Sequence, residues 1–149
     1  MTERQLWYSL RSSSVFDWSM RIESPSTPGC PDVFYSIDGR TGWIELKSVQ
    51  KPQGVRARPL LSRLQPSQYA WHAMASQHGV RAFILLMLAD RALLLAGSRV
   101  AYWSNCTAPE LLQQALWIGG TTPSTRFEGL RMKLRETDGT LPMATTRTL

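Results

Sequence analysis

The sequence predicts an α/β fold in which a mixed central β-sheet is flanked by helices. Three observations lead to this prediction. Short apolar runs typical of strands alternate along the chain with segments of helical character. Two of these runs are joined by a turn rich in glycine and aspartate, which is typical of a β-hairpin. A helical segment then follows the hairpin and returns the chain to the sheet.

The N-terminal part of the sequence predicts a helix, a strand and a loop. Residues 2–10 carry apolar side chains at helical spacing. Residues 15–22 alternate apolar and polar side chains, as a half-buried strand does. Residues 24–31 contain three prolines and a glycine, a composition that predicts a loop.

The next segment predicts the hairpin. Residues 32–37 and residues 43–49 both have the composition of strands. The intervening residues 38–42 are Asp-Gly-Arg-Thr-Gly, and aspartate and glycine tolerate the backbone twist of a tight turn. The two strands are therefore expected to pair antiparallel around Gly39.

Beyond the hairpin, the sequence predicts a basic loop, two helices and two further strands. Residues 51–59 are basic and contain two prolines. Residues 66–79 begin with proline and end with glycine, as helices often do. Residues 80–88 and 91–96 are apolar runs of strand length, and residues 109–116 are expected to form another helix.

Composition favours one folded domain, because 43% of the residues are hydrophobic and 19% are charged. We expect residues 1–135 to form this domain and the polar residues 136–149 to form a flexible tail. The longest apolar run, residues 82–89, is too short to cross a bilayer, and the N-terminus has no apolar segment typical of an export signal. We therefore expect no membrane association, and we expect Cys30 and Cys106 to be reduced thiols.

The charge of the chain is uneven as well as positive. The formal net charge is +6, and no acid occurs between Glu45 and Asp90. The basic residues in that interval are Lys47, Lys51, Arg56, Arg58, Arg63 and Arg81. Such a block of one sign within a folded domain predicts a positive surface, and a phosphate backbone is the commonest partner of a positive surface.

The residues with the clearest chemical meaning lie in the hairpin. Asp32 begins one strand and Glu45 lies in the other, so a turn near Gly39 brings their carboxylates close together. Glu45 and Lys47 are two residues apart, and both side chains therefore point to the same face of the strand. Two close carboxylates repel unless a cation lies between them, and proteins commonly bind Mg²⁺ through one or two carboxylates. Lys47 would then hold the attacking water or neutralise charge that builds on a phosphate.

The motif Pro31-Asp32 followed by Glu45-Leu46-Lys47 resembles the signature of the PD-(D/E)XK nuclease superfamily. The longer segment GCPDVFYSIDGRTGWIELK is similar to phage nucleases near the Holliday-junction resolvases and the VRR-NUC nucleases. The resemblance implies a restriction-endonuclease-like core and an endonuclease that depends on Mg²⁺ or Mn²⁺. It also implies that Asp32, Glu45 and the carbonyl of Leu46 bind the metal, while Lys47 assists the nucleophilic water.

The superfamily often adds an upstream acid and a glutamine from the helix that follows the motif. Glu23, at the end of the strand predicted over residues 15–22, is the upstream acid that we favour. Glu3 on the first predicted helix is the alternative. Gln68 matches the helix glutamine, which supports the site or contacts DNA, and Gln65 is the alternative. The resemblance covers residues 3–97.

These inferences predict a metal-dependent DNA endonuclease. The resemblance implies a homodimer, in which each site cuts one strand, and a location in the cytoplasm of a phage-infected or other bacterial cell. A branched substrate such as a Holliday junction would suit a dimer, but no sequence feature is specific for branches. The alternatives are a non-catalytic DNA-binding or inhibitory protein on a nuclease-like fold, and a protein-binding module whose basic loop contacts acidic partners. The cations expected to contact the DNA backbone are Lys51, Arg56, Arg58 and Arg63.

The two histidines do not suggest a metal site. His72 and His78 fall in and just after the predicted helix 66–79, and their spacing of six puts them on different helical faces. Neither has a metal-ligating partner at a useful spacing. We expect partly exposed side chains at both positions.

Overall fold

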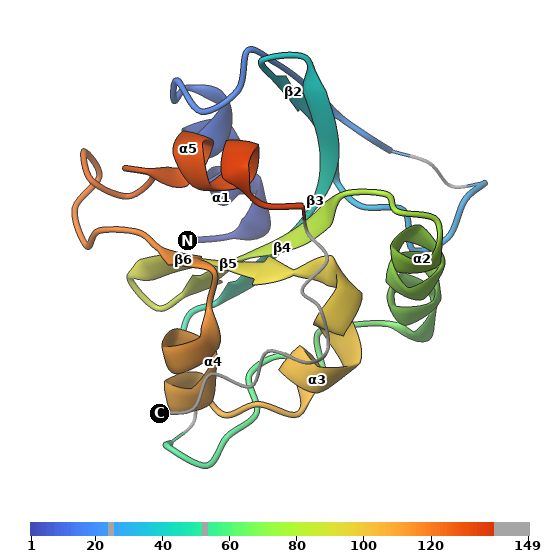
Figure 1. Ribbon diagram of the computed structural model, residues 1–149. Coiled ribbons are helices and arrows are strands. Elements are labelled where there is room, and N and C mark those ends of the chain that lie inside the picture. Colours follow the sequence, from blue (N-terminus) through green and yellow to red (C-terminus); the bar gives the residue numbers. More distant parts are fainter. Residues whose placement is uncertain (24–25, 52–53, 139–149) are drawn as a thin grey trace.

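The computed structural model describes residues 1–23, 26–51 and 54–138. Six strands form one mixed sheet in the order β1-β2-β3-β4-β5-β6, and helices lie on both of its faces (Figure 1). Strands β3 and β4 run parallel, whereas the other neighbouring strands run antiparallel. The predicted α/β fold with a mixed central sheet flanked by helices is confirmed. The elements are α1 (Glu3–Arg11), β1 (Trp18–Arg21), β2 (Val33–Ile37), β3 (Arg40–Val49), α2 (Pro66–Gln77), β4 (Ala82–Leu88), β5 (Arg91–Ala96), the 3₁₀ turn η1 (Gly97–Arg99), α3 (Val100–Ser104), α4 (Ala108–Gln114), β6 (Trp117–Ile118) and α5 (Leu130–Glu136).

Strands β2 and β3 form the predicted hairpin around a two-residue turn. Ile37 pairs with Arg40, so the turn consists of Asp38 and Gly39, whose φ values are 50° and 79°. Positive φ at both positions is the conformation of a type I′ turn, which matches the twist of the flanking strands. The turn is shorter than the sequence predicts because β3 already begins at Arg40.

The two faces of the sheet pack against different helices (Figure 1). Ile44 and Leu46 of β3 belong to the core on the side of α1 and α5. Val49 belongs to the core on the opposite side, towards α2, α3 and α4. Because side chains alternate along a strand, Glu45 and Lys47 point to the same side as Val49, beneath the start of α2. The crossover from β3 through α2 to β4 therefore covers the face that carries the charged residues.

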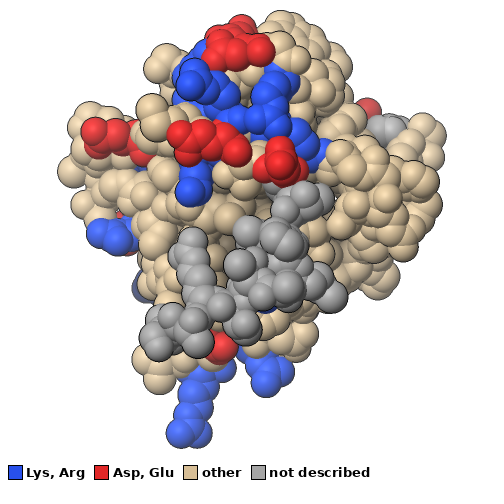
Figure 2. All heavy atoms as spheres, in the orientation of Figure 1, with Lys and Arg blue, Asp and Glu red and all other residues tan. Residues whose placement is uncertain are grey.

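The C-terminal helix α5 is attached to the tip of the hairpin by ion pairs. Arg131 contacts Asp17 at 2.8 Å and Asp38 at 3.1 Å, and Arg135 contacts Asp38 at 3.2 Å. Figure 2 shows Lys and Arg side chains interleaved with Asp and Glu side chains at the top of the molecule, where α5 and β2 lie in Figure 1. Helix α5 ends at Glu136, just past the predicted end of the domain, and residues 139–149 of the predicted tail lie outside the described residues.

Several boundaries differ from those predicted, and the short elements were not predicted. The strand expected over residues 15–22 spans only Trp18–Arg21, and the helix expected over residues 66–79 ends at Gln77. Residues 24–25 and 52–53 of the two predicted loops lie outside the described residues. Both cysteines are free, as expected, and no helix within the described ranges has the length and apolar character needed to span a membrane. The elements without a sequence prediction are η1, α3, β6 and α5. The first three span at most 5 residues, too few to show a clear period.

His72 is fully buried, which contradicts the predicted partial exposure. Its side chain is 1% exposed because α2 turns it towards η1, where Gly97 has no side chain. A Cβ atom at Gly97 would lie 2.6 Å from Nδ1 of His72, so glycine makes room for the imidazole. Burial lowers the pKa of His72 to about 4. His78 follows α2 and is exposed, as predicted.

Candidate active site

The hairpin register brings Asp32 and Glu45 opposite each other. Val33 pairs with Ile44, so Asp32 and Glu45 are the next positions along β2 and β3. The Asp32 carboxylate accepts a hydrogen bond at 2.8 Å from the backbone N–H of Leu46. This bond continues the ladder past the last paired residue of β2 and fixes Asp32 beside β3. The sequence-based prediction that these two acids converge is therefore met by the geometry.

Glu45 is a buried acid whose two carboxyl oxygens differ in their surroundings. Its side chain is almost fully enclosed, and the residue is 3% exposed. Oε1 accepts a hydrogen bond at 2.8 Å from Nε2 of Gln68 and lies 3.6 Å from Nζ of Lys47. Oε2 has no hydrogen-bond partner within the part of the chain that the structure describes. An unpartnered buried carboxyl oxygen is costly, and it is the feature that a bound cation would satisfy.

The surroundings of Glu45 oppose its ionisation. Burial raises the pKa of Glu45 to about 9, and the negative charge of Asp32 adds to this effect. The Lys47 ammonium group acts in the opposite direction and lowers the pKa, but its effect is smaller. Without a further positive charge, Glu45 is therefore protonated at neutral pH. A divalent cation would reverse this balance and keep the carboxyl group ionised.

Gln68 serves both its own helix and the carboxyl group of Glu45. It occupies the third position of α2, where its Oε1 accepts a hydrogen bond at 2.9 Å from the backbone N–H of Gln65, the N-cap residue. This bond leaves the Nε2 amide free to donate to Glu45. The amide oxygen and nitrogen are thus both used within the protein, so the predicted DNA contact at Gln68 corresponds to a supporting position beside the carboxylates. Gln65 is exposed at the start of the helix.

A glycine allows the loop before Asp32 to pack against the start of α2. Gly29 has a φ of 82°, and a Cβ atom on it would lie 2.0 Å from the carbonyl oxygen of Ser67. No residue with a side chain fits there without displacing either the loop or the helix. The same contact therefore holds together the two segments that carry Asp32 and Gln68.

The structure separates the two alternatives for the upstream acid. Glu3 begins α1, and its charge is among those that raise the pKa of Glu45. The start of α1 is held at β3 by a hydrogen bond from the Ser48 hydroxyl to the carbonyl oxygen of Met1. Glu23 follows β1 and is exposed. Of these two acids, Glu3 is therefore the one whose charge acts on Glu45.

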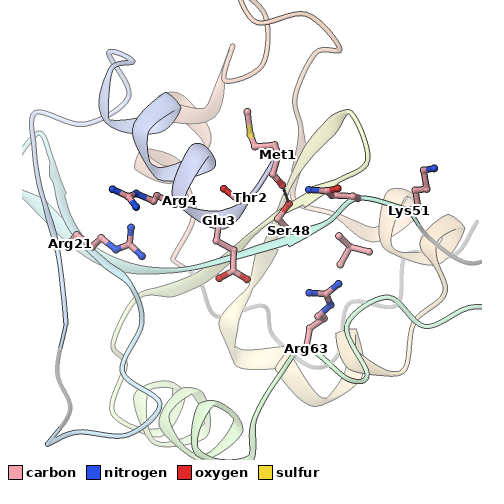
Figure 3. A pocket seen from close by; sticks show the side chains of 10 residues that line it. Met1, Thr2, Glu3, Arg4, Arg21, Ser48, Lys51 and Arg63 are labelled. Carbon is pink, nitrogen blue, oxygen red and sulfur yellow. Dashed lines mark hydrogen bonds between the residues drawn. The ribbon is translucent and has the colours of Figure 1, made fainter.

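An open cleft adjoins this group at the C-terminal end of β3. It has a volume of about 590 Å³ and is lined in part by Ser48 and Val49, which directly follow Lys47. Figure 3 shows Glu3 reaching into the cleft, with Arg21 and Arg63 pointing in from opposite sides. The four basic residues of the lining are Arg4, Arg21, Lys51 and Arg63.

The predicted DNA contacts divide into two groups. Lys51 and Arg63 line the cleft, whereas Arg56 and Arg58 are exposed on the loop before α2 and lie outside it. Arg4 and Arg21 line the cleft without having been predicted. The sequence holds no local signal for these two, because α1 and β1 come together with β3 only in the folded chain.

Comparison with known proteins gives a likeness to solved structures but no family. No family model and no curated protein matches the sequence. The fold is similar to a solved structure of the Holliday junction resolvase Hjc from the archaeal hyperthermophile Archaeoglobus fulgidus, with a TM-score of 0.43. The two chains are 18% identical, and the match covers 62% of this chain and 72% of the resolvase.

The chemistry of the donor set fits a hard divalent cation. Among the described residues, no three His, Cys, Asp or Glu side chains gather closely enough to form a metal site by themselves. Asp32 and Glu45 provide two carboxyl groups, and Mg²⁺ commonly binds to proteins through one or two carboxylates with water completing its shell. Within a strand residue the N–H and C=O groups point to the same neighbour, so the Leu46 carbonyl is directed to the side of Asp32. These oxygens fit the ligand set that the PD-(D/E)XK resemblance implies.

Proposed function

We propose that the protein is a divalent-metal-dependent endonuclease that hydrolyses phosphodiester bonds in DNA. The observation that carries this proposal is the environment of Glu45, a buried carboxyl group that faces Asp32, bonds to Gln68 and lies 3.6 Å from Nζ of Lys47. Such a pair of acids is stable in the ionised form only beside a cation. The basic cleft next to it supports a polyanionic substrate.

Asp32, Glu45 and the carbonyl of Leu46 are the proposed metal ligands. Glu3 is the further acid that we propose in place of Glu23, because its charge acts on Glu45. When bound, Mg²⁺ or Mn²⁺ would polarise the phosphate and make a nearby water more acidic.

Lys47 is the residue proposed to act on the reacting atoms. It is 8% exposed and lies on the same face of β3 as Glu45, so its ammonium group is largely removed from bulk water. Its N–H groups can orient a water towards phosphorus and stabilise the charge that builds on the phosphate oxygens. In-line attack by this water would leave a 3′-hydroxyl and a 5′-phosphate, as the superfamily resemblance implies. Gln68 is a positioning residue, since it acts through Glu45.

The PD-(D/E)XK resemblance extends the proposal to the substrate and the assembly. We propose a homodimer, since each site cuts one strand, and branched DNA as the preferred substrate. The cytoplasm of a bacterial cell is the location that follows from a phage nuclease of this kind. These parts of the proposal rest on the motif that contains Asp32, Glu45 and Lys47.

A cleavage assay tests the proposed activity. Four-way junction, linear duplex and single-stranded DNA would be incubated with Mg²⁺, Mn²⁺ or EDTA, and the wild type would be compared with Glu45→Ala and Lys47→Ala. We expect metal-dependent cutting that falls by about 100-fold or more in both variants, the usual effect of removing a group that stabilises transition-state charge. DNA binding without cutting under any metal would instead identify a non-catalytic DNA-binding protein on this fold.

A further inference from the structure

The cleft beside the carboxylate pair lies one step further along the same strand. Ser48 and Val49 line it, and they follow Lys47 directly on β3. Two residues of a strand span about 7 Å. This distance is close to the separation of about 7 Å between successive phosphates on one strand of a DNA duplex, whose backbone winds around the axis as it rises about 3.4 Å per nucleotide. A phosphate in the cleft would therefore belong to a nucleotide next to the one whose bond is cut.

The basic residues of the cleft come from four separate segments and outnumber the acids among its described lining residues. Arg4 lies on α1, Arg21 on β1, Lys51 just after β3 and Arg63 just before α2. Among the residues that the structure describes, none of the four takes part in an ion pair. By contrast, the arginines of α5 at the hairpin tip each have an aspartate partner. Four cations that line one cleft favour the binding of an anion there.

Glu3 places a negative charge among the cations of this cleft. It is the one acid among the described lining residues, and it reaches between Arg21 and Arg63 (Figure 3). The Glu3 carboxylate therefore repels a phosphate in the cleft when no cation is bound. A cation held by Asp32 and Glu45 would offset this repulsion.

We infer that the cleft is a second phosphate-binding site for the substrate strand, in which Arg21 and Arg63 bind a phosphodiester group beside the one that is cut, and in which Glu3 makes this binding depend on a divalent cation. The inference rests on the proposed nuclease function. It adds one DNA contact, Arg21, that the acid-free segment of the sequence does not contain.

The test measures DNA binding separately from cleavage. Fluorescence anisotropy of a labelled duplex would be recorded over a series of salt concentrations, with Ca²⁺ and with EDTA, for the wild type, Arg21→Ala and Arg63→Ala. The slope of log K against log salt is negative, and each variant is expected to make it less steep by about 0.9. This is the value for one lost phosphate contact on duplex DNA. Arg11→Ala is the matched control, because it removes the same charge from the exposed opposite end of α1. Melting temperatures would verify that each variant is folded.

Glu3→Gln tests the cation dependence. The wild type is expected to bind DNA more tightly in Ca²⁺ than in EDTA, and Glu3→Gln is expected to bind in EDTA more tightly than the wild type does. Inorganic phosphate is added as a competitor of DNA binding. If the cleft binds a DNA strand, Arg21→Ala is expected to reduce the affinity for DNA more than it reduces the affinity for inorganic phosphate. Equal weakening of both would overturn the assignment to the DNA strand and identify a site for free phosphate.

The two proposals fail in different ways. Slopes that are equal in Arg21→Ala, Arg63→Ala and Arg11→Ala would overturn the phosphate site, even if the protein cuts DNA. Absence of cutting with the expected slopes would overturn the nuclease and leave the phosphate site standing.

Discussion

Gln68 Nε2 donates a hydrogen bond of 2.8 Å to Glu45 Oε1, and this bond joins the first turn of α2 to a buried carboxyl group on β3. The same glutamine accepts from the N-cap residue through its amide oxygen. One side chain therefore determines both where the helix begins and how the carboxyl group is oriented.

Replacing Gln68 by alanine is expected to lower the cleavage rate by about 10- to 100-fold, the usual effect of removing a residue that supports a metal ligand. It is also expected to destabilise the protein by about 1 to 2 kcal/mol, because the capping bond is lost. Cleavage kinetics and urea unfolding would be measured beside Gln77→Ala at the exposed far end of α2. Equal effects of the two substitutions would contradict the role assigned to Gln68.

The stability of the metal-free protein is expected to fall as pH rises, because of Glu45. The pKa of Glu45 is raised from 4.5 to about 9 in the fold, so between these values the native state binds a proton that the unfolded chain releases. Glu45→Gln keeps the Gln68 and Lys47 neighbours without the titration. Urea unfolding in EDTA from pH 5 to pH 9 is expected to show a steeper loss of stability in the wild type than in Glu45→Gln.

Adding Mg²⁺ at high pH provides a check that does not depend on activity. The cation is expected to raise the melting temperature of the wild type, because it binds the folded protein alone. The same addition is expected to leave Glu45→Gln nearly unchanged. A parallel rise in both proteins would argue against Glu45 as a ligand.

The contact between Gly29 and Ser67 predicts an effect on the site from a residue that carries no functional group. Gly29→Ala combines a strained φ with a Cβ atom that meets the Ser67 carbonyl, and the expected cost is about 2 to 4 kcal/mol. Gly54→Ala is the matched control, since Gly54 has a similar φ of 90° but no described residue lies within 4 Å of its added Cβ. We expect a reduced cleavage rate only in Gly29→Ala, because its loop leads into Asp32. Cleavage assays and thermal melts of both variants would measure this difference.

His72 is expected to make the protein less stable in mild acid. Its folded pKa of about 4 lies below the unfolded value of 6.5, so the unfolded chain binds the extra proton as pH falls through this interval. The difference in unfolding free energy between the wild type and His72→Leu isolates this effect, because Glu45 titrates in both proteins. That difference is expected to shift in favour of the variant between pH 6.5 and pH 4. A constant difference would contradict the burial of a neutral imidazole.

The sequence was most informative where partners are close along the chain. Asp32 and Glu45 lie across a tight turn, so counting residues from Gly39 was enough to predict that they meet. Glu45 and Lys47 share a face by the alternation of a single strand. Contacts between segments that are distant along the chain, by contrast, have no signal in the local sequence. Glu3 approaches Glu45 only because α1 packs beside β3, which is why the sequence favoured Glu23.

The same distinction explains the other differences. His72 is buried because α2 packs against η1, an element too short to be predicted. The basic cleft needs four segments to come together, and only the two cations inside the acid-free interval, Lys51 and Arg63, were predicted.

The ion pairs between α5 and Asp38 can form only late in protein synthesis. Arg135 is separated from Asp38 by 97 residues, yet it binds the turn that determines the pairing of β2 and β3. A ribosome adds about 5 to 20 residues per second, so about 5 to 20 s pass between the synthesis of the turn and that of Arg135. During this interval the hairpin lacks its ion pairs with α5. Asp32 and Glu45 are then held in place only by the pairing of β2 with β3. The proposed site is therefore fully assembled only after α5 has been synthesised.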